Sequence, residues 1–74
     1  MSNQLFIIKH DDGIRGIYID FTSAKNELKN IYKNTPDYNA YGYQINIYNL
    51  IDNEYIITNE YYTYNFDKFT KNEI

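Results

Sequence analysis

The chain has 74 residues, no cysteine, one histidine and a formal net charge of −3 at pH 7. This length allows one domain at most, with a core near the smallest that folds alone. Disulfides and thiolate zinc sites are excluded, and the negative charge disfavours binding to nucleic-acid phosphates by charge alone. We therefore expect a single domain whose core is supplemented by association with a partner.

Tyrosine supplies 10 of the 74 residues, and isoleucine, asparagine and lysine are also abundant. These residue types have A/T-rich codons, so the bias indicates an A/T-rich genome. No apolar run approaches the roughly 18 residues that span a bilayer. The first four residues, Met-Ser-Asn-Gln, lack the charged start of a signal peptide, and we expect a soluble, intracellular protein.

Residues 5–19 predict a β-hairpin, because Asp12 and Gly13 lie between two apolar runs. A two-residue loop at this point would place Ile8 opposite Ile17. One face of the hairpin would then carry Phe6, Ile8, Ile17 and Ile19. The other face would carry Leu5, Ile7 and Tyr18.

Residues 21–33 predict a helix that begins after an N-cap at Asp20 and ends before Pro36. Lys33 in the last turn suits the helix dipole. One stripe of the helix is apolar and should face the core: Phe21, Ala24, Leu28, Ile31 and Tyr32.

A loop over 34–42 leads to a second predicted hairpin over 43–64. Its register depends on the turn, because a two-residue loop would set Ile45 and Ile47 against Glu60 and Thr58 and mix the faces. We therefore expect a three-residue loop, 52–54. It aligns Ile45, Ile47, Ile51, Tyr55, Ile57 and Tyr61 toward the helix. The opposite face then carries Gln44, Asn46, Tyr48, Leu50, Ile56, Thr58, Glu60 and Tyr62.

The last segment, 65–74, is expected to be a loose tail, with a helical turn open as an alternative because Phe66 and Phe69 are three residues apart. We therefore predict that the whole chain, 1–74, forms a single α+β domain. The predicted fold is ββαββ, an antiparallel four-stranded sheet with one helix packed on one face.

The segment Gly16-Ile17-Tyr18-Ile19-Asp20-Phe21, followed by Ala24 and Leu28, joins a strand to a capped helix, and a Tyr-x-Ile run begins at Tyr43. This arrangement resembles small uncharacterised ββαββ proteins of large A/T-rich DNA viruses, such as the giant viruses of amoebae, and of phages. The resemblance implies a shared architecture and transfers no active site.

His10, Asp11 and Asp12 form the one cluster with the residue types of a site for a divalent cation or for proton transfer. The simpler interpretation, which we favour, is a turn. Gly16 is expected at a strand bulge or a close approach of the chain. Ser23 has no plausible catalytic triad, because the only histidine lies at the far end of the predicted hairpin. We predict no catalytic residue, no metal, no cofactor and no enzymatic activity.

A tyrosine- and isoleucine-rich sheet face without a helix would be more apolar than the surface of most monomers. We predict that it is an interface, through which the protein forms a homo-oligomer, preferably a dimer, or binds a viral or host protein. Its residues are Leu5, Ile7, Tyr18, Tyr48, Leu50, Ile56 and Tyr62. The alternative is stacking of single-stranded nucleic acid on the tyrosines. The resemblance places the protein in the host-cell cytoplasm or the virion.

Overall fold

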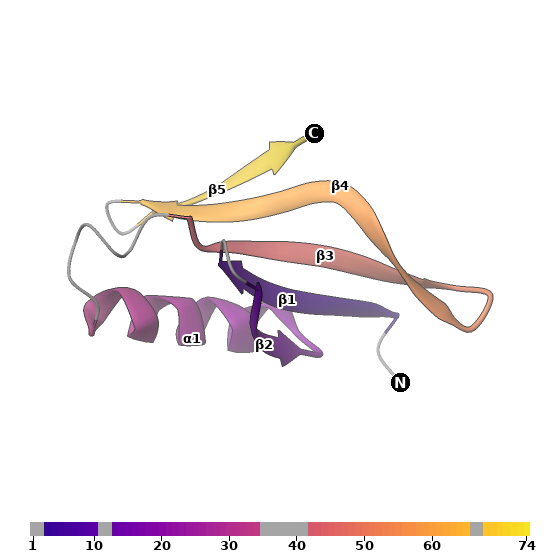
Figure 1. Ribbon diagram of the computed structural model, residues 1–74, viewed down its shortest axis with the longest axis horizontal. Helices are drawn as coiled ribbons and strands as arrows, with labels where there is room; N and C mark the ends of the chain where they lie inside the picture. Colours follow the sequence, from indigo (N-terminus) through magenta and orange to yellow (C-terminus); the bar gives the residue numbers. More distant parts are fainter. Residues whose placement is uncertain (1–2, 11–12, 35–41, 66–67) are drawn as a thin grey trace.

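The computed structural model describes residues 3–10, 13–34, 42–65 and 68–74. It contains one helix and five strands, and neighbouring strands are antiparallel in the order β2-β1-β3-β4-β5. The elements are β1 (Gln4–His10), β2 (Gly13–Tyr18), α1 (Phe21–Lys33), β3 (Gln44–Ile51), β4 (Glu54–Asn65) and β5 (Lys68–Glu73). Helix α1 lies along one face of the sheet (Figure 1).

The expected four-stranded sheet and loose tail are wrong, because residues 68–73 form a fifth strand. β5 pairs with β4, and its one aromatic residue, Phe69, lies opposite Tyr64 and packs against the core. The alternative of a helical turn involved Phe66, which lies outside the described residues, and Phe69, which is in this strand. The fold remains a small α+β domain.

The predicted helix over 21–33 and its cap are confirmed. A side-chain oxygen of Asp20 accepts the backbone N–H of Ser23 at 2.7 Å, and the Ser23 hydroxyl donates to the other oxygen at 3.0 Å. The first of these bonds satisfies a backbone donor that the first turn leaves without a helical partner. Ala24 and Leu28 are fully buried against the sheet.

The core lies between α1 and the sheet. Its buried members share the helix-covered face: Phe6, Ile8, Ala24, Leu28, Ile45, Ile47 and Tyr64. Phe21 links this core to the outer strands, because its ring centroid lies 4.4 Å from that of Tyr62 and 6.3 Å from that of Phe69. Aromatic side chains of β4 and β5 thus pack against Phe21 in the first turn of the helix.

The expected register of the first hairpin is wrong by one residue. Ile7, rather than Ile8, lies opposite Ile17, and Ile8 lies opposite Gly16. The register shifts between Ile8 and Lys9, at a bulge in β2. Because side chains alternate along a strand, the one-residue difference from the expected register places Ile17 on the face away from the helix and Tyr18 on the helix face.

The expected bulge or close approach at Gly16 is confirmed. A Cβ built on Gly16 would lie 2.7 Å from the Tyr18 ring. The absence of a side chain therefore leaves room for the Tyr18 ring beside Gly16, on the helix side of the sheet.

The second hairpin has a two-residue loop, not the expected three-residue loop. Asp52 and Asn53 have φ values of 51° and 66°, as in a type I′ turn, and Ile51 lies opposite Glu54. The predicted conflict of faces is resolved further along β4. Residues 58–60 lie against the single residue Ile47, which moves Tyr62 opposite Ile45.

Thr58 holds this irregularity in place. Its hydroxyl donates to the carbonyl of Ile47 at 2.9 Å and accepts the backbone N–H of Glu60 at 3.2 Å. The bulge adds two residues to β4, and an even number leaves the alternation of side chains between the two faces unchanged. Tyr55, Ile57 and Tyr61 therefore all point to the face opposite the helix, contrary to the expectation.

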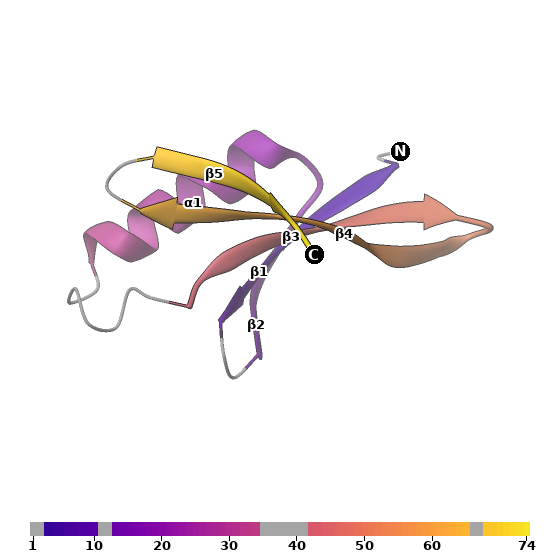
Figure 2. The same cartoon turned by 90° about the horizontal axis from the view of Figure 1, so that it is seen from above.

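Beyond this bulge the end of the β3–β4 hairpin projects past helix α1 as an arm, which we define as residues 48–57 (Figures 1 and 2). The arm is joined to the body along one edge only. There β1 pairs with β3 through Gln4 and Leu5, and the Leu50 N–H donates to the Asn3 carbonyl at 2.8 Å.

Candidate functional site: the open sheet face and the arm

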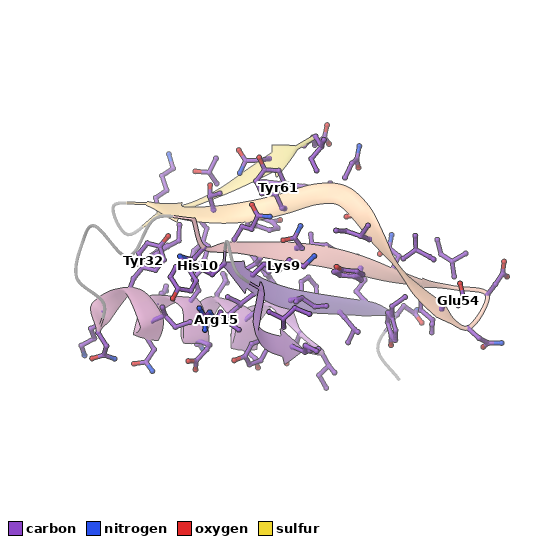
Figure 3. All side chains as sticks on the ribbon, in the orientation of Figure 1. Lys9, His10, Arg15, Tyr32, Glu54 and Tyr61 are labelled. Carbon is purple, nitrogen blue, oxygen red and sulfur yellow. The ribbon has the colours of Figure 1, made fainter. Side chains whose placement is uncertain are left out.

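The sheet face opposite helix α1, here called the open face, is defined by the strand registers. Figure 3 shows Tyr61 on the side of the sheet away from the helix and Glu54 at the tip of the arm. The apolar and aromatic side chains that the strand registers place on the open face are Leu5, Ile7, Ile14, Ile17, Tyr48, Leu50, Tyr55, Ile57 and Tyr61.

The structure brings four of the seven predicted interface residues together on this face: Leu5, Ile7, Tyr48 and Leu50. Tyr18 and Tyr62 lie on the helix face instead, where both pack against the core. Ile56 lies opposite Asn49, on the helix side of the sheet but in the arm, where it is 44% exposed. The predicted set is thus divided between the two faces by the bulges.

At the centre of the open face, polar side chains form hydrogen bonds with one another. Lys9 Nζ donates to the Tyr48 hydroxyl at 2.7 Å and lies 5.3 Å from the centroid of the Tyr48 ring. Gln44 donates to the side-chain carbonyl of Asn46 at 2.9 Å. Asn46 and the neighbouring Ile7 are buried although no helix covers them. A partner at this centre would meet a largely satisfied polar surface.

Beyond Tyr48, the arm is apolar and exposed on both faces. Ile51, Tyr55, Ile56 and Ile57 are between 39% and 52% exposed. Tyr55 and Ile57 belong to the open face and Ile51 and Ile56 to the other, so both faces of the arm present apolar groups to water. The sequence-based register had assigned Tyr55 and Ile57 to the core. The Asp52-Asn53 pair, which favours a two-residue turn, was the signal that pointed to the arm.

A second group of exposed isoleucines lies in and just after β2: Ile14, Ile17 and Ile19. β2 also carries Arg15 and the bulge, and strand edges with these features pair poorly with other chains. The arm is therefore the stronger candidate for an interface.

Of the predicted histidine cluster, the structure describes His10 alone. The His10 ring stacks on Tyr43 with centroids 4.3 Å apart. Asp11 and Asp12, the rest of the predicted cluster, lie outside the described residues. Within the described ranges no three His, Asp or Glu side chains are grouped to hold a metal ion. The same ranges contain no helix with the length and apolarity to cross a membrane.

Among the described residues, local structure shifts the pKa values of Tyr18 and Lys71. Burial under the helix, and secondarily the charge of Glu27, raises the pKa of the Tyr18 phenol. The hydrogen bond and charge of Glu60 raise the pKa of Lys71, which lies 2.5 Å from it across β4 and β5.

Comparison with protein-family models, curated proteins and solved structures finds no match to this chain. Its function is therefore argued from the geometry of the open face and the arm.

Proposed function

We propose that this protein is a small, non-enzymatic interaction module that associates with a second copy of itself through the arm. The observation that supports the proposal is the exposure of Tyr55, Ile56 and Ile57, consecutive large apolar residues on a projecting hairpin. A two-stranded hairpin alone is marginally stable in water, whereas burial of its apolar side chains in an interface would stabilise it.

The small core supports the same proposal. Only three side chains in the described residues are both large and fully buried, namely Ile8, Leu28 and Ile45. Domains of this size without disulfides often gain stability by oligomerisation. The remaining exposed part of the open face would be free in such a dimer to contact a viral or host protein, in the host-cell cytoplasm or the virion.

Stacking of single-stranded nucleic acid is not supported to the same degree. That alternative used Tyr48 and Tyr62 as a joint platform, and these two side chains lie on opposite faces of the sheet. The Tyr48 ring is also engaged by Lys9.

The proposal is tested by sedimentation of the native chain over a range of protein concentrations. We expect a dimer that is lost in the double substitution I56T/I57T, which lowers apolarity but keeps β-branched side chains. The matched control is I14T/I17T, in which two isoleucines of similar or greater exposure are changed in β2. A native chain that stays monomeric at all concentrations, or equal effects of both variants, would contradict the proposal.

A further inference from the structure

The outer edge of β4 differs from the other exposed strand edges. β5 pairs with β4 only from Glu60 to Asn65, and the Ile74 N–H extends the contact to the Asn59 carbonyl. Among the described strands, only β3 pairs with β4 between Glu54 and Thr58, and none pairs with the outer edge of this stretch. The bulge held by Thr58 separates this stretch from β5.

This edge also lacks the usual protection against pairing with another chain. The edge strand β5 carries Lys68, Lys71 and Glu73, and β2 carries a bulge and Arg15. Charged residues and bulges are the common devices that keep edges from pairing. The middle of the β4 edge, by contrast, is uncharged, β-branched and exposed at Ile56 and Ile57.

The backbone of Ile57 is oriented for pairing at this edge. The Leu50 N–H donates to Asn3, so the backbone groups of Leu50, and of Tyr48 two residues earlier, face β1. Ile57 lies opposite Tyr48, so its own N–H and carbonyl point away from β3, toward the outer edge. Those of Ile56 point toward β3.

We infer that two copies pair antiparallel along this edge, with a two-fold axis at Ile56, which builds on the proposed self-association and gives it a geometry. A two-fold axis normal to the sheet requires that paired residues of the two copies have side chains on the same face of the sheet. This condition is met only when the axis passes through a residue position, and moving the axis by one residue shifts the register by two. The axis at Ile56 places Ile56 opposite Ile56 of the second copy and Ile57 opposite Tyr55. It also places Glu54 opposite Thr58, so a polar pair lies at each end of the paired stretch.

The neighbouring registers are worse. An axis one residue earlier sets the carboxylate of Glu54 against Ile56, and an axis one residue later sets Ile56 against Thr58. The chosen register alone combines apolar pairs in the centre with a polar pair at each end. It also sets the two open faces side by side as one continuous surface.

The first test removes the outward N–H of one residue. Proline lacks this donor and is tolerated on edge strands where the N–H faces solvent, so Ile57→Pro should leave the β3–β4 ladder intact. We expect it to abolish the dimer in sedimentation, with an unchanged circular dichroism spectrum. The control is Ile17→Pro: Ile17 lies opposite Ile7, whose backbone faces β3, so its N–H also points outward, on the other edge of the sheet.

The second test uses the absence of cysteine from the chain. In the inferred dimer the two Ile56 Cα atoms lie about 4.5 Å apart, so Ile56→Cys should form a disulfide-linked dimer on mild oxidation. Ile51→Cys is the control, since Ile51 has similar exposure but would lie three strand spacings, about 14 Å or more, from its counterpart.

The outcomes separate the geometry from the proposed function. A dimer that survives Ile57→Pro, or equal cross-linking of the two cysteine variants, overturns edge pairing and leaves self-association through another part of the arm. A native chain that is monomeric overturns both. If Ile57→Pro fails to fold, the cysteine pair decides alone.

Discussion

The body of the sheet and the arm are built from the same two strands and the same residue types, yet their burial differs completely. Ile45 and Tyr64 are at most 6% exposed under the helix, while Ile57 and Tyr55 in the arm are 46% and 39% exposed. The difference comes from what covers the strands: α1 and β5 both stop short of the arm (Figure 2). Residue type therefore does not decide which isoleucines and tyrosines form the core of this protein.

The largest effect should follow from substitution in the body. Leu28→Ala removes a fully buried side chain from between the helix and the sheet and should lower the free energy of unfolding by about 3 kcal/mol. Ile57→Ala in the arm should cost about 1 kcal/mol or less, because half of that side chain is already in water. Urea denaturation at low protein concentration measures both, and equal losses would show that the arm is packed as tightly as the body.

A smaller effect should follow at the bulge that separates the two regions. Thr58→Val keeps the shape of the side chain but removes both hydroxyl hydrogen bonds, which should cost about 1 kcal/mol. Hydrogen exchange at the Glu60 N–H, which loses its acceptor, should become faster. Thr70→Val on the exposed edge strand is the control, and unchanged exchange at Glu60 would show that Thr58 does not hold the bulge.

The smallest effect concerns the titration of Tyr18 in the body. Its raised pKa means that the fold favours the neutral phenol, so this stabilisation is present below about pH 10 and is lost as the pH rises through the raised value. Glu27→Gln should lower the Tyr18 pKa slightly and leave it above its ordinary value, since burial is the larger cause. NMR of isotope-labelled tyrosine measures the shift, with Glu54→Gln at the arm tip as the control. A Tyr18 pKa that does not move in Glu27→Gln would exclude the charge of Glu27 as a cause.

The sequence predicted the helix correctly because its signals are local. Asp20, Ser23 and the apolar stripe lie within one segment, and their interactions do not depend on the rest of the fold. Both hairpins were also recognised. Their registers were wrong because the alternation of apolar residues is nearly the same on either face. The bulges at Arg15 and at 58–60 decide which face each residue takes.

The fifth strand was missed for a different reason. Lys68, Lys71 and Glu73 make its sequence polar, and Phe69 alone signals burial. The strand forms because the edge of β4 offers it a backbone ladder and because Lys71 meets Glu60 there. These partners are near in space but not visible in the local pattern. The same limit explains why Tyr55 and Ile57 were predicted in the core and Tyr18 and Tyr62 on the open face.

The turn at Asp52 and Asn53 has a consequence for the order of folding. It joins strands that are adjacent in sequence, so the arm closes a short loop, and hairpins of this kind form within about 1–10 μs. β1 and β3, which form the centre of the sheet, must instead find each other across the whole helix and its connection, which is a slower, non-local step. The arm should therefore take shape early and serve as the template on which the N-terminal strand later aligns.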